Sequence, residues 1–118
     1  MLDLLPLLMF LPSWYEIPMT NGYTRENESD GAVYGSARIN IVMVFGLIHT
    51  PAETQLGNGI AQLPEGYRPQ KQVWITAIDV IAHASYSLRV TPNGGIHSWG
   101  TALPQNAIME IPMQGFYS

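Results

Sequence analysis

The residues best suited to chemistry in this sequence are aromatic and polar side chains around Trp99. Trp99 follows a glycine-rich turn and comes two residues after His97. Carbohydrate sites place an aromatic ring under the apolar face of a sugar and surround it with hydrogen-bonding side chains. We therefore predict a saccharide platform at Trp99; its other candidate contacts are His97, Arg89, Asp79, His83 and Trp74. The alternative, which is the more common role of tryptophan, is that Trp74 and Trp99 pack in the core or in an interface.

The three histidines are candidate metal ligands, but their spacing does not support a site. No two of His49, His83 and His97 stand four residues apart or in an HExxH arrangement, and these spacings are typical of zinc-binding helices. We therefore predict structural histidines, no bound metal and no cofactor.

A calcium loop is the alternative interpretation of the polar segment 23–31. Its acids alternate like the opening of such a loop, at Glu26, Glu28 and Asp30. The twelfth position of a calcium loop normally supplies a bidentate acid, and Ala37 stands there. The pattern favours a solvated loop.

Catalysis would need paired carboxylates or an activated nucleophile. The sequence has no G-x-S-x-G motif and no glycine-rich phosphate loop. His97 and Ser98 are adjacent, so on a strand they point to opposite faces. We predict that the protein is not an enzyme. The alternative is glycan cleavage by Asp79 and Glu110 assembled between subunits, which would require both carboxylates to line one cleft.

The low charge content of the chain points to self-association. Its 118 residues have room for one domain. Charged residues make up 12% of the chain, against about 25% in typical soluble domains. Because a small monomer normally covers its surface with charged side chains, we predict that part of this surface is buried against identical copies.

Composition also excludes several classes of partner. The net charge is −4, and the basic residues are scattered, so we expect no nucleic-acid partner. No stretch supplies the roughly 18 uninterrupted apolar residues of a membrane span, so we expect no membrane insertion. The absence of cysteine excludes disulfides and thiol catalysis.

The breakers in the sequence predict an all-β fold. Nine prolines and eleven glycines are spread along the chain and leave little room for long helices. We expect a β-sandwich or jelly-roll-like barrel of about eight antiparallel strands. The expected strands are Trp14–Met19, Arg38–Ile48, Gly59–Leu63, Gln72–Val80, Tyr86–Thr91, Ile96–Trp99, Ala107–Ile111 and Gln114–Tyr117.

The clearest of these strands is Arg38–Ile48. One face is apolar throughout, and the opposite face begins polar and becomes apolar; the first face consists of Ile39, Ile41, Met43, Phe45 and Leu47. A strand that is apolar on both faces is central in its sheet or lies under a second subunit.

The N-terminal segment 1–12 is treated separately from the predicted domain 13–118. It is apolar and proline-broken, with Asp3 but no basic residue and no small-residue cleavage site, so it does not fit a secretory signal. We interpret it as an apolar arm, a remnant of a neck or shaft, which packs on the body or along an oligomer axis.

The segment Leu63–Pro69 has the chemistry of a rigid corner between two strands. Its prolines force the preceding residues, Leu63 and Arg68, into extended conformations. Gly66 permits a tight turn, and Tyr67 can bury its ring while its hydroxyl finds a partner.

This LP-x-GYRP corner resembles one in the C-terminal head domains of phage tail-fibre and baseplate receptor-binding proteins. Two further features agree in order and spacing. Ile39–Leu47 leads into Gly59–Leu63, similar to the strand that precedes the corner in that family, and Leu88–Ile96 resembles the hairpin that follows it. The resemblance spans Trp14–Ser118.

The resemblance implies a fold and a general role. Such heads are homotrimeric β domains at the tip of a tail fibre or baseplate, where they bind saccharides or other components of the bacterial surface. The implied partners are further copies of the chain, host saccharide, and other tail or baseplate proteins of the virion. The alternative is a structural trimerisation or capping module that contacts no host ligand. No ligand-binding residue carries over by motif.

Overall fold

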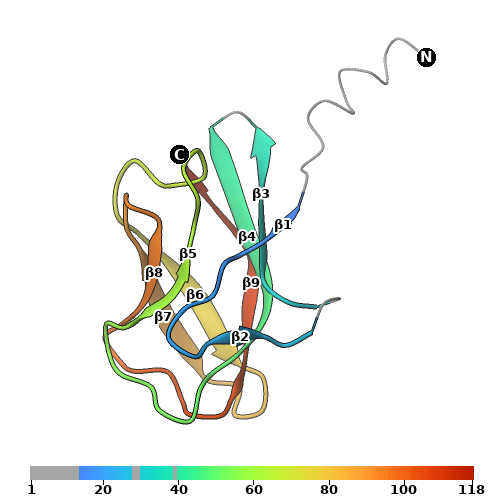
Figure 1. Ribbon diagram of the computed structural model, residues 1–118, viewed down its shortest axis with the longest axis vertical. Helices are drawn as coiled ribbons and strands as arrows, with labels where there is room; N and C mark the ends of the chain where they lie inside the picture. The colour runs from blue at the N-terminus through green and yellow to red at the C-terminus, as the bar shows by residue number, and fades with distance from the viewer. Residues whose placement is uncertain (1–13, 28–29, 39) are drawn as a thin grey trace, which may run out of the picture.

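The computed structural model describes residues 14–27, 30–38 and 40–118, which contain nine strands and no helix (Figure 1). The all-β prediction is confirmed. The predicted arm 1–12 lies outside the described residues. The strands are β1 (Tyr15–Glu16), β2 (Thr24–Arg25), β3 (Val33–Arg38), β4 (Ile41–His49), β5 (Gly59–Gln62), β6 (Val73–Asp79), β7 (Ser85–Val90), β8 (Gly95–Trp99) and β9 (Ile108–Tyr117).

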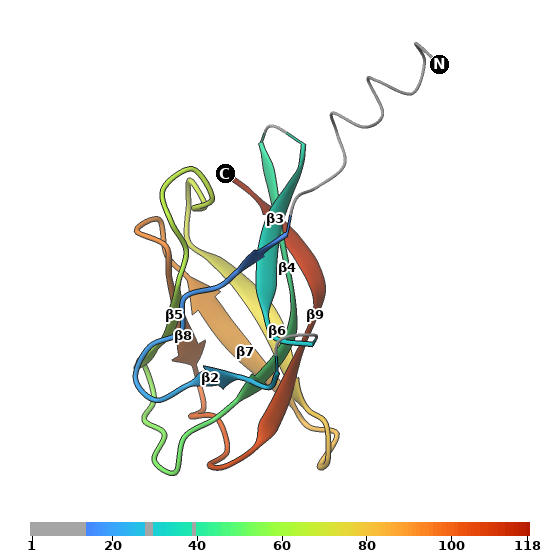
Figure 2. The ribbon, with the colours of Figure 1, turned by 45° about the vertical axis from the view of Figure 1, so that its right-hand side comes forward.

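The nine described strands belong to one curled sheet, not to the two facing sheets of a sandwich. Their order is β1-β3-β4-β9-β6-β7-β8-β5, β2 pairs with β4, and all pairs of named strands are antiparallel. Figure 2 shows β3, β4 and β9 side by side along one side of the molecule. The homotrimer remains a prediction.

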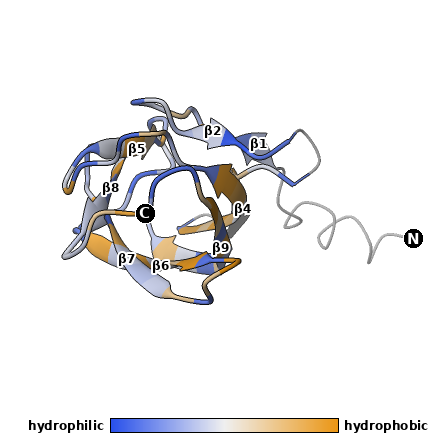
Figure 3. Ribbon diagram, turned by 90° about the horizontal axis from the view of Figure 1, so that it is seen from below, coloured by the Kyte–Doolittle hydropathy of each residue, from blue (hydrophilic) through white to orange (hydrophobic). Residues whose placement is uncertain are grey.

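The segment after β1 joins the two edges of this sheet. Ile17 donates its N–H to Ala32 beside β3 at 3.2 Å, and the Gln62 N–H of β5 donates to the Pro18 carbonyl at 2.9 Å. Met19 also forms a bridge with Ala61. The sheet is thereby curled into the barrel-like ring seen end-on in Figure 3.

Strand β4 is central, as its two apolar faces predicted. Val42, Val44 and Ile48 are fully buried in the core, while Met43 and Phe45 are half-buried on the outer face. The predicted start at Arg38 was wrong, because Arg38 belongs to β3 and Asn40 lies in the turn between the strands. Ile39 lies outside the described residues.

Strand β3 was not predicted. Its sequence, VYGSAR, contains Gly35 and Ser36, which interrupt the alternation of β-branched and aromatic side chains that marks a strand. Pairing with β4 nevertheless makes it regular as far as Ser36, where a register shift begins. Tertiary pairing therefore outweighs weak local propensity here.

The two segments expected at 107–111 and 114–117 form one strand, β9. Ile111 pairs with Gly46 and Gln114 with Val44, so Pro112 and Met113 together oppose Phe45 alone. This bulge accommodates Pro112, which has no N–H to offer a regular ladder.

The corner at Leu63–Pro69 and the hairpin turn between β7 and β8 contact each other. Leu63 donates its N–H to the Gly94 carbonyl at 2.8 Å, and Gln62 Nε2 donates to the Asn93 carbonyl at 2.6 Å. Arg68 Nε donates to the Leu63 carbonyl at 2.9 Å. The two motifs that carry the family resemblance thus form one structural unit.

Candidate functional site

The outer face of β6, β7 and β8 brings four of the six predicted site residues together. Trp74 lies opposite Arg89, and Arg89 lies opposite His97. Trp99 pairs with Ser87, one outward position along β7 from Arg89. Side chains directly opposite or diagonal across antiparallel strands are within contact distance, so the pairing register alone groups these side chains.

Two tryptophan rings form the centre of this group. The Trp74 and Trp99 ring centroids are 6.1 Å apart with an interplanar angle of 64°. Trp74 is 53% exposed and Trp99 is 44% exposed. Adjacent exposed aromatic rings form an apolar patch, and such patches often mark binding sites. We call Trp74, Arg89 and Trp99 the tryptophan platform.

Arg89 supports the ring of Trp99. Its Cζ lies 4.9 Å from the Trp99 ring centroid, within the range of a cation–π contact. Its Nε is buried and has no hydrogen-bond partner within the described part of the chain. No carboxylate of these described residues forms an ion pair with Arg89, so the platform carries a positive charge.

Trp99 lines two open depressions. One, of about 340 Å³, lies on the side of Arg89 and is lined by Leu56, Gly57, Arg89, Ser98, Trp99 and Gly100. The other, of about 430 Å³, is lined by Ala84, Ser85, Tyr86, Ser87, Trp99, Gly100 and Thr101. Their hydroxyls and exposed rings suit a polyhydroxylated ligand.

Sequence reasoning did not name Leu56 or Ser87 as site residues. The sequence did contain a signal for Ser87. It occupies an outward position of the alternating strand that also contains Arg89, two residues further along. Leu56 had none. It lies in a loop that reaches the platform through tertiary structure, and the loop is held there by a 3.3 Å contact between His97 Nδ1 and the Gly57 carbonyl.

Asp79 and His83 lie away from the tryptophan platform, at the β6–β7 turn. Asp79 is 8% exposed, and its Oδ1 accepts the N–H groups of Ile81 at 2.9 Å and Ala82 at 3.0 Å. His83 adopts φ 57° in the turn and donates its N–H to the Asp79 carbonyl at 2.8 Å. Trp74 lies towards the opposite end of β6, so the fold separates these two candidates from the other four.

The two carboxylates considered for glycan cleavage lie on opposite faces of the sheet. Asp79 pairs with Met109, whose side chain is fully buried, whereas Glu110 pairs with Ile78 and is exposed. Within one protomer they therefore line no common cleft. No group of three histidine or acidic side chains in the described residues could hold a metal ion.

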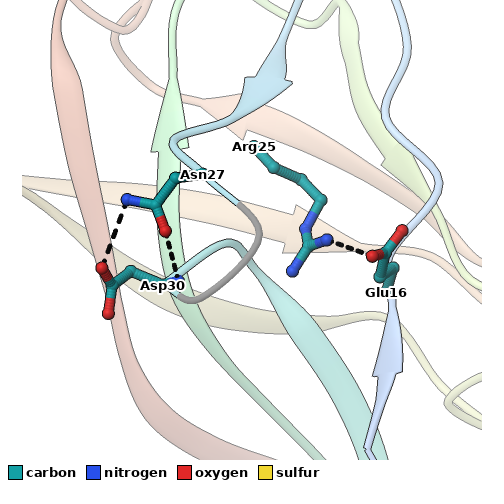
Figure 4. Close-up of polar contacts among 4 residues, drawn as sticks. All are labelled: Glu16, Arg25, Asn27 and Asp30. Atoms are coloured by element: carbon teal, nitrogen blue, oxygen red, sulfur yellow. Dashed lines mark hydrogen bonds and ion pairs between the residues drawn. The ribbon is translucent and has the colours of Figure 1, made fainter.

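The polar loop after β2 is closed by local hydrogen bonds (Figure 4). Asn27 Oδ1 accepts the Asp30 N–H at 2.7 Å, and Asn27 Nδ2 donates to the Asp30 carboxylate at 3.2 Å. Arg25 pairs with Glu16 of β1. Glu28, one of the acids of the calcium-like pattern, lies outside the described residues.

A second exposed feature covers the outer side of β4 and β9. The ring of Trp14 packs edge-on against Phe45, with centroids 4.8 Å apart. Both line an open groove of about 660 Å³ with Leu47 and Met113, and Met113 is 56% exposed. We call this surface the β4–β9 face.

No helix among the described residues is long and apolar enough to cross a membrane.

Comparison with known proteins identifies the fold. No protein-family model and no curated protein matches this sequence. Among solved structures, the receptor binding protein (gp15) of Listeria phage PSA matches with a TM-score of 0.76 at 13% sequence identity. The match covers 99% of this chain and 71% of that chain. The chain therefore shares the fold of that receptor binding protein, in agreement with the fold that the resemblance of the corner and hairpin motifs implied.

Proposed function

We propose that this chain is a receptor-binding domain at a phage tail fibre or baseplate tip, where it attaches the virion to saccharide on the bacterial surface. The fold supports attachment in general. The observation that supports saccharide as the ligand is the tryptophan platform. Two exposed rings lie together there, Arg89 lies over one of them, and shallow depressions adjoin Trp99. Aromatic faces bind the apolar face of sugars, and neighbouring polar groups bind their hydroxyls.

The exposed platform also bears on the structural alternative. A trimerisation or capping module with no host ligand would bury Trp99 in the assembly, for example on a threefold axis. Trp99 lies beside the polar groups of Arg89 and Ser87, which favours a binding surface, and a trimer that buries Trp99 between protomers would favour the structural alternative instead. The proposal is binding without cleavage, and its support is that Asp79 is buried and uses its Oδ1 to accept two backbone N–H groups in the β6–β7 turn.

The proposed assembly is a homotrimer with shallow sites at or near subunit interfaces. Its support is the β4–β9 face, where Trp14 and Met113 expose apolar surface in the protomer. Binding at each site would be weak, because the depressions are open and enclose little of a ligand. Several sites that engage one cell surface together would multiply the effective affinity.

Adsorption of the purified protein to bacterial cells and to a glycan array tests the proposed function. Trp99→Ala should weaken binding by about tenfold or more, because a tryptophan at the centre of an interface typically contributes on the order of 2 kcal/mol. Trp74→Ala should have a similar effect. Circular dichroism should show that both variants remain folded, since both side chains lie on the outer face of the sheet and neither belongs to the buried core.

Ile81→Ala is the matched control. Ile81 is 79% exposed in the β6–β7 turn, outside the platform, so its loss should leave adsorption unchanged. Undiminished adsorption of Trp99→Ala would remove Trp99 from the site. A wild-type protein that binds neither cells nor any glycan would overturn the proposal.

A further inference from the structure

Strands β6 and β9 pair over only a short distance. Their backbone pairing is limited to Ile78 with Glu110 and Asp79 with Met109. The β9 bulge at Pro112 and Met113 follows directly along the chain. Beyond it the two strands are no longer joined by a regular backbone ladder.

The side chain of Gln114 spans the gap between the separating strands. Its Oε1 accepts the Thr76 N–H at 2.7 Å, and its Nε2 donates to the Thr76 carbonyl at 2.8 Å. A primary amide offers the same donor and acceptor as a peptide group, so the Gln114 side chain satisfies the Thr76 backbone groups in place of a β9 backbone partner. The sheet therefore opens beyond Thr76.

The opening is a cleft of about 540 Å³ between β6 and β9. Trp74 of β6 and Tyr117 of β9 both line it, and they are 53% and 69% exposed. Phe116, which is buried, also lines it. The segment Gln70–Gln72 completes the lining with two primary amides and one ammonium group, and none of the described lining residues is acidic.

We infer that this cleft is a second saccharide subsite, continuous with the tryptophan platform. Trp74 is shared by both, since its ring is 6.1 Å from that of Trp99 and also lines the cleft. The ligand is therefore an oligosaccharide that runs over Trp74 from Trp99 to Tyr117, not a single sugar. The aromatic walls suit sugar faces, and the amides of Gln70 and Gln72 suit hydroxyls. This inference rests on the proposed function.

Chain-length dependence of binding tests the inference. Fragments of the surface polysaccharide from an adsorbed strain are separated by length, and titration calorimetry measures their affinity for the wild-type protein. Longer fragments should bind about tenfold more tightly than the shortest, because they fill both subsites. Tyr117→Ala should remove most of that advantage and leave the affinity for the shortest fragments unchanged. Gln72→Ala should act in the same direction, and its exposed position avoids a folding defect.

Ile81→Ala is again the control and should keep the full advantage of the longer fragments. Equal affinity for short and long fragments would overturn the second subsite while leaving the proposed function intact. An equal loss for all lengths in Tyr117→Ala would also overturn it, because Tyr117 would then act on the platform itself. Failure of the proposed function is distinguishable: the wild type would bind no fragment of any length.

Discussion

At the scale of single residues, Arg89 is held by contacts that leave its charge unpaired. Its guanidinium lies over Trp99, and its buried Nε has no hydrogen-bond partner in the described part of the chain. A cation–π contact at a partly exposed site contributes about 0.5–1 kcal/mol, less than the roughly 1.5–3 kcal/mol of a hydrogen bond to a charged group. Arg89 therefore orients the Trp99 ring, and its guanidinium could gain a stronger interaction by donating a hydrogen bond to an acceptor on the ligand.

Tyr23 is another residue with an unmet polar group. It is 4% exposed, and its hydroxyl has no hydrogen-bond partner among the described residues. A buried, unpaired hydroxyl costs about 1 kcal/mol or more, so Tyr23→Phe should raise the free energy of unfolding by about 1 kcal/mol. Urea denaturation at neutral pH measures the change. A destabilised variant would show that the hydroxyl has a partner.

The same variant should change the alkaline stability. Burial raises the pKa of Tyr23 above its ordinary value of 10.0. The unfolded chain therefore loses this proton at a lower pH than the folded chain, and stability falls as the pH rises from about 10 through the folded pKa. Tyr23→Phe should therefore lose less stability than the wild type over that range, as urea denaturation at a series of alkaline pH values would show.

At the scale of elements, the corner and the β7–β8 hairpin depend on each other. Gly94 adopts φ 90°, and a Cβ added there would lie 2.4 Å from the Leu63 carbonyl oxygen. Gly66 has nearly the same φ, 89°, but nothing lies within 4 Å of its Cβ position. Gly94 is thus required both by its backbone conformation and by its close contact with Leu63, whereas Gly66 is required by its backbone conformation alone.

Substitution of these two glycines separates the two requirements. Gly66→Ala should cost about 1 kcal/mol for the left-handed conformation. Gly94→Ala should cost about 3 kcal/mol, because it adds a clash with backbone that has no flexible end to move. Thermal or urea unfolding of both variants gives the comparison. Equal losses would show that the corner and hairpin are not in close contact.

At the scale of the whole molecule, apolar residues lie on both sides of the sheet. The core is filled by the inner side chains of β4, β7 and β9, yet Trp14, Trp74, Trp99 and Met113 remain exposed. The tryptophan platform and the β4–β9 face are separate groups of these residues, and we propose saccharide as the ligand of the first and further copies of the chain as the partner of the second. In that proposal, both exposed apolar groups of a chain with 12% charged residues would be covered by a partner.

Light scattering in dilute buffer tests the assembly. The wild-type protein should have the mass of three protomers, and Met113→Lys should dissociate it by placing a charge on the β4–β9 face. Ile81→Lys places the same charge on an exposed side chain in the β6–β7 turn and should leave the trimer intact. A monodisperse wild-type monomer would contradict the homotrimer, and a trimer in Met113→Lys would move its interface elsewhere.

Local chemistry in the sequence was enough to predict most strands, the corner and the turns. Alternation in Tyr86–Val90 identifies the buried Leu88 and Val90, because side chains on a strand alternate with period two. The prolines and Gly66 identify the corner, because they restrict or permit backbone conformations at their own positions. The all-β class also follows from the sequence alone, whereas the sequence left open whether Trp74 and Trp99 are exposed or packed in the core or an interface.

Only the tertiary structure decided which residues meet. Trp74 and Trp99 come together through the register of three strands, and the register gathers Arg89 and His97 with them while Asp79 stays in a turn. Gln114 reaches Thr76 across 38 positions of sequence. Such contacts depend on sheet order, curling and bulges, which are set by the packing of the whole core and leave no periodic mark near the residues they join.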